Sequence, residues 1–431
     1  MMNSPQRLIV YSPQFHTHRG GAEKYTAWLA RGLLDKGYDV SIVCNKNERK
    51  SEAYALDTAI RVHEVDNSDR NTAVRELRAQ LQANRADVVV AIYSDAHLLI
   101  AILAAAPLGI PVVASEHAHP SFIEGHAWNR PDRLAALLAA AHIHVIDAQT
   151  TSSLPPPLRE KSFVIANPVP PAQQFAQPNA ASPTKRLISL GRLDPVKQFD
   201  LLIEAFATVH GDHRDWTLEI WGEGQEKNRL FRLIQKLGME KNIFLRGFTD
   251  NITPVLASGH CFCLPSRSEI FGLALGEAMA HGLPSVGFAS TTGVNQLITH
   301  EKNGLLAEET SAAGLATCLR TLFSSAELRA TIGAEARKTA ELYCPELLLE
   351  QWDSLLRQSA GVKRETVEPL DEYTLAYARL QDYLARDNPL SPEALQKALA
   401  KIHRSRTWRC IMWLRKIRSR LNILKRFKKT S

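Results

Sequence analysis

The sequence predicts an α/β protein in which two parallel, doubly wound sheets follow one another and a basic helical extension comes last. Three observations support this prediction. Short apolar, β-branched runs alternate with segments of helical periodicity, as in chains that build parallel sheets covered by helices. The alternation stops in residues 169–184, which are rich in Pro, Ala and Gln, and it restarts at residue 186. A chain of 431 residues is also too long for one ordinary hydrophobic core.

The net charge of +7 is unevenly distributed along the chain. Of the 52 Lys and Arg residues, 13 lie after Glu393, whereas none of the 45 Asp and Glu residues does. The sequence therefore predicts a mildly acidic globular body that ends in a strongly basic segment.

The six cysteines favour a reducing compartment, because they lie mostly in apolar segments without the clustering of a metal site. Cys261 and Cys263 should point to the same face of a strand as buried thiols. The N-terminus lacks the apolar core of a signal peptide, and the longest apolar run, residues 98–114, is interrupted by two prolines and a glycine. We therefore expect a cytoplasmic protein without a membrane span.

The N-terminal half reads as the start of a parallel sheet. A strand is predicted at Leu8 to Ser12, a loop at Gly20-Gly21, a helix at Ala22 to Leu34 and a second strand at Val40 to Cys44. The loop lacks the G-x-G-x-x-G pattern, so dinucleotide binding has little support. Further strands are predicted at Val88 to Ile92, Val112 to Ser115 and Ala141 to Asp147.

Two histidines follow the strand at Val112 to Ser115. His117 and His119 come just past its carboxyl end, where an open α/β sheet has its crevice. Their H-x-H spacing could also hold a metal, but no cluster of carboxylates or cysteines supports that alternative. His142 and His144 repeat the spacing inside a predicted strand, and we interpret them as packed or hydrogen-bonded core residues.

The same periodicity returns after the linker. The expected strands and helices are Arg186 to Leu190, Leu201 to Val209, Thr217 to Trp221, Lys227 to Leu237, Ile243 to Gly247, Cys261 to Leu264, a helix from about Gly272, and a strand from Pro284. The loop before that last helix carries Glu269, and the helix carries Glu277. A helix N-terminus can receive an anion such as a diphosphate, and the two carboxylates could accept hydrogen bonds from sugar hydroxyls. This stretch predicts a nucleotide-sugar site.

Residues 265–284 follow the pattern P-S-x-x-E-x-F-G-L-x-x-x-E-A-M-A-x-G-x-P. This pattern resembles the donor-sugar signature of the retaining GT-B glycosyltransferases of family 4, the glycosyl transferases group 1. Gly20-Gly21-Ala22-Glu23 is similar to a G-G-A-E turn of that family, and residues 164–169 resemble its interdomain strand and Asn-Pro-Val exit. The resemblance implies two Rossmann-like domains that face a cleft. Its domains would be an acceptor-binding domain in residues 1–168, a linker in 169–184, a nucleotide-sugar domain in 185–344, a helix in 345–358 that returns to the first domain, and the extension in 359–431.

The resemblance also implies roles for individual residues. Gly21, Arg192, Lys197 and the amides of Phe271, Gly272 and Leu273 would hold the donor diphosphate. Glu269 would bind donor-sugar hydroxyls, Glu277 the ribose diol, and His117, or His119 in its place, the reacting centre. Three residues depart from the common pattern: Gln198 and Ile270 stand where Gly is frequent, and Gln296 stands where Glu is usual. Ile270 makes the loop over the sugar bulkier.

These features predict a hexosyltransferase that uses a nucleoside-diphosphate sugar and a saccharide acceptor. The resemblance implies retention of configuration, no metal and no other cofactor, with UDP as the commoner nucleotide. Bacterial cell-envelope polysaccharide or lipopolysaccharide biosynthesis would suit a lipid-linked acceptor. The alternatives are a nucleotide-sugar epimerase or hydrolase of the same fold, and a non-catalytic scaffold subunit.

The basic extension predicts helices at Leu370 to Leu384 and within Pro392 to Lys428. From Trp413 onward, apolar residues form one stripe and the basic residues lie mostly off it. Residues 404–429 therefore suit an anionic membrane surface, which would place the protein on the inner face of the plasma membrane. A solvated tail or a packed helical cap is the alternative, and nucleic acid has no motif in its favour.

Overall fold

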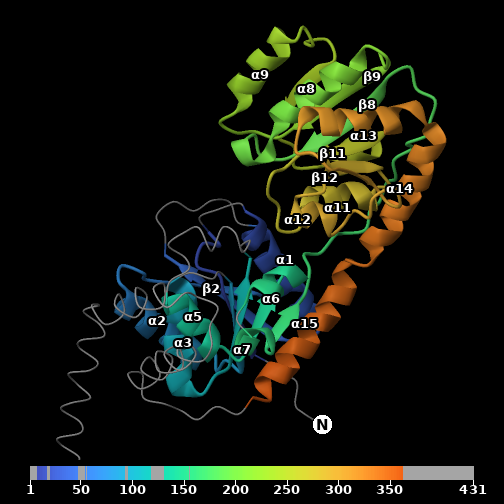
Figure 1. Cartoon of the computed structure of the whole chain (residues 1–431). Coiled ribbons are helices and arrows are strands. Elements are labelled where there is room, and N and C mark those ends of the chain that lie inside the picture. Colours follow the sequence, from blue (N-terminus) through green and yellow to red (C-terminus); the bar gives the residue numbers. More distant parts are fainter. Residues whose placement is uncertain are drawn as a thin grey trace, which may run out of the picture. The chain divides into compact units, whose positions relative to one another are not determined.

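The computed structural model describes residues 7–16, 20–46, 54, 56–92, 96–117, 131–154 and 156–362 (Figure 1). The chain divides into two compact units. The first comprises Met1–Val145, Thr150–Val164 and Trp352–Ser431, and the second comprises Ile146–Gln149 and Ile165–Gln351.

The first unit contains a seven-stranded parallel sheet in the order β3-β2-β1-β4-β5-β6-β7. Its strands are β1 (Arg7–Tyr11), β2 (Asp39–Asn45), β3 (Arg61–Val65), β4 (Val88–Ile92), β5 (Val112–Glu116), β6 (His142–Val145) and β7 (Ser162–Val164). Its helices are α1 (Gly21–Asp35), α2 (Arg70–Ala83), α3 (Ala96–Ala105), α5 (Pro131–Ala139), α6 (Ala148–Ser153) and α7 (Pro156–Arg159). The run Val-Val-Val-Ala-Ile of β4 is buried throughout, because helices cover both faces of a parallel sheet.

The second unit contains a six-stranded parallel sheet in the order β10-β9-β8-β11-β12-β13. Its strands are β8 (Lys185–Leu190), β9 (Trp216–Trp221), β10 (Ile243–Gly247), β11 (Cys261–Leu264), β12 (Ser285–Phe288) and β13 (Leu305–Ala307). Its helices are α8 (Phe199–His210), α9 (Lys227–Lys236), α10 (Thr253–Ala257), α11 (Leu273–Ala280), α12 (Thr292–Asn295), α13 (Ala312–Ser324), α14 (Ala326–Glu341) and the first part of α15 (Pro345–Ala360).

Each face of the second sheet has its own apolar core. Cys261 and Cys263 contribute to the core shared with α8, α9 and α13, whereas Phe262 and Leu264 contribute to the core shared with α11 and α14. This alternation follows from the two-residue period of a strand. It confirms that the two cysteines share one face and are buried as free thiols.

Both sheets reverse their strand order at an internal point. In the second unit the chain leaves β8 toward β9 on one side and returns to β11 on the other, and in the first unit β1 and β4 are related in the same way. The crevice outside the carboxyl ends of such neighbouring strands is where open α/β sheets bind ligands. The loops after β8 and β11 therefore lie where a ligand of the second unit is expected to bind.

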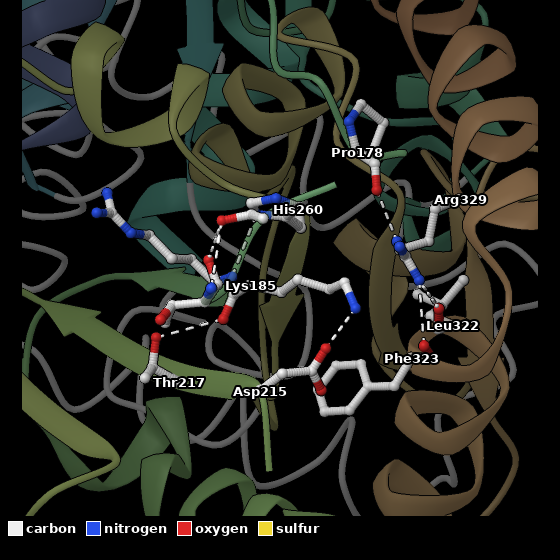
Figure 2. Close-up of polar contacts among 11 residues, drawn as sticks. Pro178, Lys185, Asp215, Thr217, His260, Leu322, Phe323 and Arg329 are labelled. Carbon is white, nitrogen blue, oxygen red and sulfur yellow. Dashed lines mark hydrogen bonds and ion pairs between the residues drawn. The ribbon is translucent and has the colours of Figure 1, made fainter. Parts of the chain in front are cut away.

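The linker packs on the second unit through Arg329 of α14. Figure 2 shows the buried guanidinium, whose Nε donates to the Pro178 carbonyl at 2.7 Å and whose Nη1 donates to the carbonyls of Leu322 and Phe323 at 2.8 and 3.2 Å. As expected for the linker, no helix or strand lies between residues 169 and 184. The buried guanidinium thus donates to three carbonyl groups, one of which belongs to the linker.

Most predicted elements are confirmed to within one or two residues. The interdomain strand with its Asn-Pro-Val exit was predicted at residues 164–169, but β7 ends at Val164, and Pro168 has no N–H to extend a ladder. The short edge strands β3 and β13 were not predicted, and neither were the helices α2, α3, α5, α13 and α14. The expected helices at Leu370 to Leu384 and within Pro392 to Lys428 lie outside the described residues. In the part of the chain that is described, no helix is both long and apolar enough to span a membrane.

Candidate active site

The loops after β8 and β11 meet at the carboxylate of Glu269. Its Oε1 accepts a hydrogen bond from the Ser266 hydroxyl at 2.7 Å and forms an ion pair with Nζ of Lys197. The Lys197 and Glu269 side chains are only 19% and 14% exposed. Among the described residues, Oε2 of Glu269 accepts no hydrogen bond. One oxygen is therefore held by the protein, while the other can serve a ligand.

Arg192 supplies a second cation at the end of β8. Its side chain is 76% exposed, and its Nε donates to Oδ2 of Asp194 at 2.6 Å. Oδ1 of Asp194 accepts from the Val196 amide at 3.2 Å and so caps the short turn Pro195–Lys197. The loop thus presents one exposed guanidinium and one largely buried ammonium, both of which could bind a phosphate.

Two glycines that follow β9, Gly222 and Gly224, allow this loop to pack closely against them. A Cβ on Gly222 would lie 1.9 Å from the Gly191 carbonyl oxygen, and one on Gly224 would lie 2.2 Å from the Leu193 carbonyl oxygen. The loop is tied down by bonds from the Gly191 amide to the Trp221 carbonyl and from the Leu193 amide to the Glu223 carbonyl, at 3.0 and 2.9 Å. The sequence shows Gly-x-Gly after a strand, but only the structure shows which loop packs against it.

Helix α11 begins directly after the Glu269 loop. Gly272, at its N-cap, has a φ of +73°, a conformation that favours glycine. Ile270 is half-buried and Phe271 is buried, so Phe271 can offer a ligand only its backbone. Within the described part of the chain, the amides of Phe271, Gly272 and Leu273 donate no hydrogen bond. They lie at the positive end of the helix dipole and could receive an anion.

The start of α12 also holds the Glu269 loop in place. The Gly293 amide donates to the Glu269 carbonyl at 3.1 Å, and the Thr291 hydroxyl donates to the Ser266 carbonyl at 2.6 Å. A Cβ on Gly293 would lie 2.7 Å from the Phe271 nitrogen. These residues fix the direction of Glu269 without contacting its carboxylate, and we did not single them out from the sequence for this role.

Glu277 lies one turn into α11 and is half-buried. Its carbonyl accepts from the His281 amide at 3.2 Å and lies 2.8 Å from Nδ1 of the same histidine. Two departures from the family pattern can also be placed. Gln198 has a φ of +47°, and the side-chain Oε1 atoms of Gln198 and Gln296 are buried and accept no hydrogen bond from the residues that the structure describes.

In the first unit, Gly21 opens α1 at the loop after β1. The Gly20 amide donates to Oε2 of Glu23 at 2.9 Å, so the N3 glutamate satisfies the N-cap amide, as in one half of a capping box. A Cβ on Gly20 would lie 2.6 Å from that oxygen, whereas one on Gly21 would meet nothing within 4 Å. A side chain at position 20 would therefore have to displace the Glu23 carboxylate, whereas a Cβ at Gly21 would meet none of the described residues.

His117 follows β5 and belongs to a polar cluster under the end of the sheet. Its Nε2 lies 2.9 Å from the Ser115 hydroxyl oxygen, which lies 2.8 Å from Nδ1 of His144. Burial, and the neighbouring His144, hold the pKa of His117 well below its ordinary value, so the ring is neutral. The preceding Glu116 forms a buried bidentate ion pair with Arg133 at 2.8 and 2.5 Å. His144 is a hydrogen-bonded core residue, as predicted, and His119 lies outside the described residues.

The predicted site residues thus form two groups. Gly21 and His117 belong to the first unit, and Arg192, Lys197 and the residues from Glu269 to Glu277 belong to the second. Within the described residues, no three His, Cys, Asp or Glu side chains are grouped so that they could hold a metal ion.

Comparisons with known proteins give two family matches, which follow one another along the chain. The family described as glycosyl transferases group 1 matches residues 172–339, and glycosyltransferase family 4 matches residues 19–173. An uncharacterized glycosyltransferase of Haemophilus influenzae is 28% identical over 353 residues, which are 78% of this chain and 96% of that protein. The poly(ribitol-phosphate) alpha-N-acetylglucosaminyltransferase of Staphylococcus aureus is 31% identical over 174 residues, 40% of this chain and 35% of that protein.

A solved structure, Anabaena HepE in complex with UDP and glucose, has the same fold. It superposes with a TM-score of 0.63 at 20% identity and covers 81% of this chain and 99% of that one. The two family matches meet at residues 172–173, inside the linker.

Proposed function

This chain belongs to the GT-B glycosyltransferases, and we propose that it moves a hexose-type sugar from a nucleoside-diphosphate sugar to a saccharide hydroxyl. We further propose that the sugar keeps its anomeric configuration, that the nucleotide is UDP, and that neither a metal nor another cofactor takes part. The complex of HepE with UDP and glucose supports this choice of donor.

One observation carries the proposal: at the point where the strand order reverses, Lys197 pairs with the Glu269 carboxylate, its loop also carries the exposed Arg192, and the amides that begin α11 follow directly after Glu269. Cations and amides suit a diphosphate, whereas a carboxylate with one unused oxygen suits a sugar hydroxyl. Arg192, Lys197, Gly21 and the amides of Phe271 to Leu273 would hold the diphosphate. Glu269 would bind donor-sugar hydroxyls beside Ile270, and Glu277 would bind the ribose diol.

The proposed chemistry follows from these placements. The bond from the anomeric carbon to the diphosphate breaks, and negative charge builds up on the leaving oxygen. Arg192 and Lys197 would stabilise that charge, because preformed charges need no reorganisation during the reaction. The acceptor oxygen attacks the anomeric carbon from the side that the diphosphate leaves, and the acceptor proton passes to the leaving phosphate. His117 would position the acceptor.

We also propose that the acceptor is a lipid-linked saccharide of bacterial cell-envelope polysaccharide or lipopolysaccharide assembly. The Staphylococcus aureus relative, whose name specifies a poly(ribitol-phosphate), supports a polymeric acceptor. The basic residues 404–429 support a cytoplasmic protein that docks on an anionic membrane, although that segment lies outside the described residues.

Thermal unfolding with a panel of UDP-, GDP- and ADP-sugars, in the presence of EDTA, tests the donor site. A ligand at about 100 times its Kd adds about 2.7 kcal/mol to the stability of the folded state. We expect one nucleotide class to raise the Tm of the wild type. That shift should be lost in Glu277→Ala and kept in Glu204→Ala, which removes an exposed glutamate of α8.

The same panel, incubated with saccharide acceptors, separates transfer from its alternatives. Transfer to an acceptor supports the proposal, whereas release of free sugar or epimerisation would assign another reaction to the fold. Absence of a shift with every donor would contradict the donor site and indicate a scaffold subunit.

A further inference from the structure

The Ser115 hydroxyl joins two imidazole rings beneath the proposed acceptor site. Its oxygen lies 2.9 Å from Nε2 of His117 and 2.8 Å from Nδ1 of His144. Ser115 and His144 are buried, whereas His117 is half-buried and follows the carboxyl end of β5. This series of hydrogen bonds therefore runs from the core of the first unit to the carboxyl end of β5.

A serine hydroxyl has a single proton, so it can donate to only one of the two rings. The other ring must then donate its own N–H to the serine oxygen. At least one of the two nitrogens that face Ser115, Nε2 of His117 and Nδ1 of His144, must therefore carry a proton. The tautomers of the two rings are coupled through the hydroxyl.

We propose that Ser115 and His144 are positioning residues that hold the neutral His117 in one tautomer and one ring orientation for the acceptor hydroxyl. This inference rests on the proposed function, because that function places His117 at the acceptor. A general acid, base or hydrogen-bond partner works only when the correct nitrogen faces the substrate.

Aromatic side chains restrict the rings further. The Tyr25 ring packs edge-on against His117 at 4.6 Å between centroids and is stacked on His144 at 5.8 Å. Nε1 of Trp352 donates to the Tyr25 hydroxyl at 2.6 Å, and the Trp352 ring lies 4.6 Å from His144. Rotation of either imidazole would require this packing to move.

The same strand supplies a matched control. Nδ1 of His142 lies 2.8 Å from the hydroxyl oxygen of Ser359, which is buried and donates to the Leu355 carbonyl at 2.8 Å. Ser359→Ala therefore removes a buried serine–histidine hydrogen bond from the same unit without touching His117. It reports the purely structural cost of such a change.

The direct test is the ring nitrogen spectrum of His117 in the ligand-free full-length protein, recorded by 15N NMR. We expect a single neutral tautomer in the wild type and in Ser359→Ala, and a mixture in Ser115→Ala and His144→Phe. Ser115→Thr, which keeps a hydroxyl, should restore the single tautomer. An unchanged tautomer in Ser115→Ala would overturn the proposal, and this readout does not depend on the identity of the donor or acceptor.

Transfer kinetics provide the second readout. Ser115→Ala should lower kcat about 100-fold, because a misplaced group costs a factor of that order, with little change in the KM of the donor. Ser359→Ala should leave kcat close to that of the wild type. Equal losses of kcat in the two variants would mean that the Ser115 hydrogen bonds have only a structural role. Failure of every donor to bind would reject the proposed function, but the NMR result would still test whether Ser115 fixes the tautomer of His117.

Discussion

Lys197 and Glu269 form an ion pair although 72 positions separate them in the chain. Lys197 follows β8 and Glu269 follows β11, and these strands are neighbours in the sheet. The cation proposed for the diphosphate and the carboxylate proposed for the sugar therefore hold each other in place. The Ser266 hydroxyl adds a second bond to the same carboxylate oxygen, so Glu269 has a defined direction before any ligand arrives.

Replacing Lys197 with Met should lower the kcat of sugar transfer by about 10²- to 10³-fold, the effect usual for the loss of one stabilising group in a transition state. Lys185→Met is the matched control, because Lys185 forms an ion pair with Asp215 at the opposite end of β8. That variant should retain kcat. If both variants lose activity equally, or neither does, Lys197 has no special part in the reaction.

Gly222→Ala should destabilise the second unit by about 4 kcal/mol or more, because the added Cβ would lie 1.9 Å from the Gly191 carbonyl oxygen. Gly238 also has a positive φ, but a Cβ there would meet nothing within 4 Å, so Gly238→Ala should cost only about 1 kcal/mol. Urea unfolding of the two variants separates steric overlap from backbone strain. Equal losses would contradict the close approach of the two loops.

Arg329→Met should lower the free energy of unfolding by about 3 kcal/mol, because it leaves three carbonyl groups without their donor. Arg337→Met serves as the control. Arg337 lies on the same helix but is exposed and packs over the Phe175 ring at 4.8 Å. Chemical denaturation measures both variants, and proteolysis within residues 170–184 should accelerate only in Arg329→Met. A similar stability for both would show that Arg329 does not fasten the linker.

His260 should make the protein less stable in acid. Its burial, together with Arg329, Lys185 and Arg186, lowers its pKa from 6.5 to about 4 (Figure 2). In the unfolded chain His260 takes up a proton as the pH falls through 6.5, whereas in the folded protein it does so only near pH 4. The free energy of unfolding is therefore unaffected by His260 above pH 6.5 and falls as the pH falls from 6.5 toward 4. Within that window the slope approaches about 1.4 kcal/mol per pH unit.

His260→Asn tests this pH dependence. Nδ1 of His260 accepts from the Arg186 amide at 3.2 Å, and the asparagine oxygen can take its place without titrating. The free energy of unfolding of the variant should therefore fall less steeply than that of the wild type between pH 6.5 and 4. Identical slopes would show that another group controls acid stability.

Most of the central strands, the irregular stretch after Val169 and the strand-loop-helix around Glu269 could be predicted from the sequence, because each depends on residues close together in the chain. Hydrophobic periodicity and turn residues report local structure directly. The edge strands β3 and β13 could not be predicted, because β3 is only partly buried and β13 has just three residues, so the apolar signal of each is weak.

Only the tertiary structure decides which of these residues act together. The pair of Lys197 and Glu269, the approach of Gly222 to Gly191, the hold of Arg329 on Pro178 and the chain from His144 to His117 all join distant segments. The order of strands in the sheet creates these contacts, and no local pattern encodes that order. Local sequence therefore specifies which kinds of groups the site contains. The packing of the sheets determines which atoms of those groups already bond within the protein and which are left to bind a ligand.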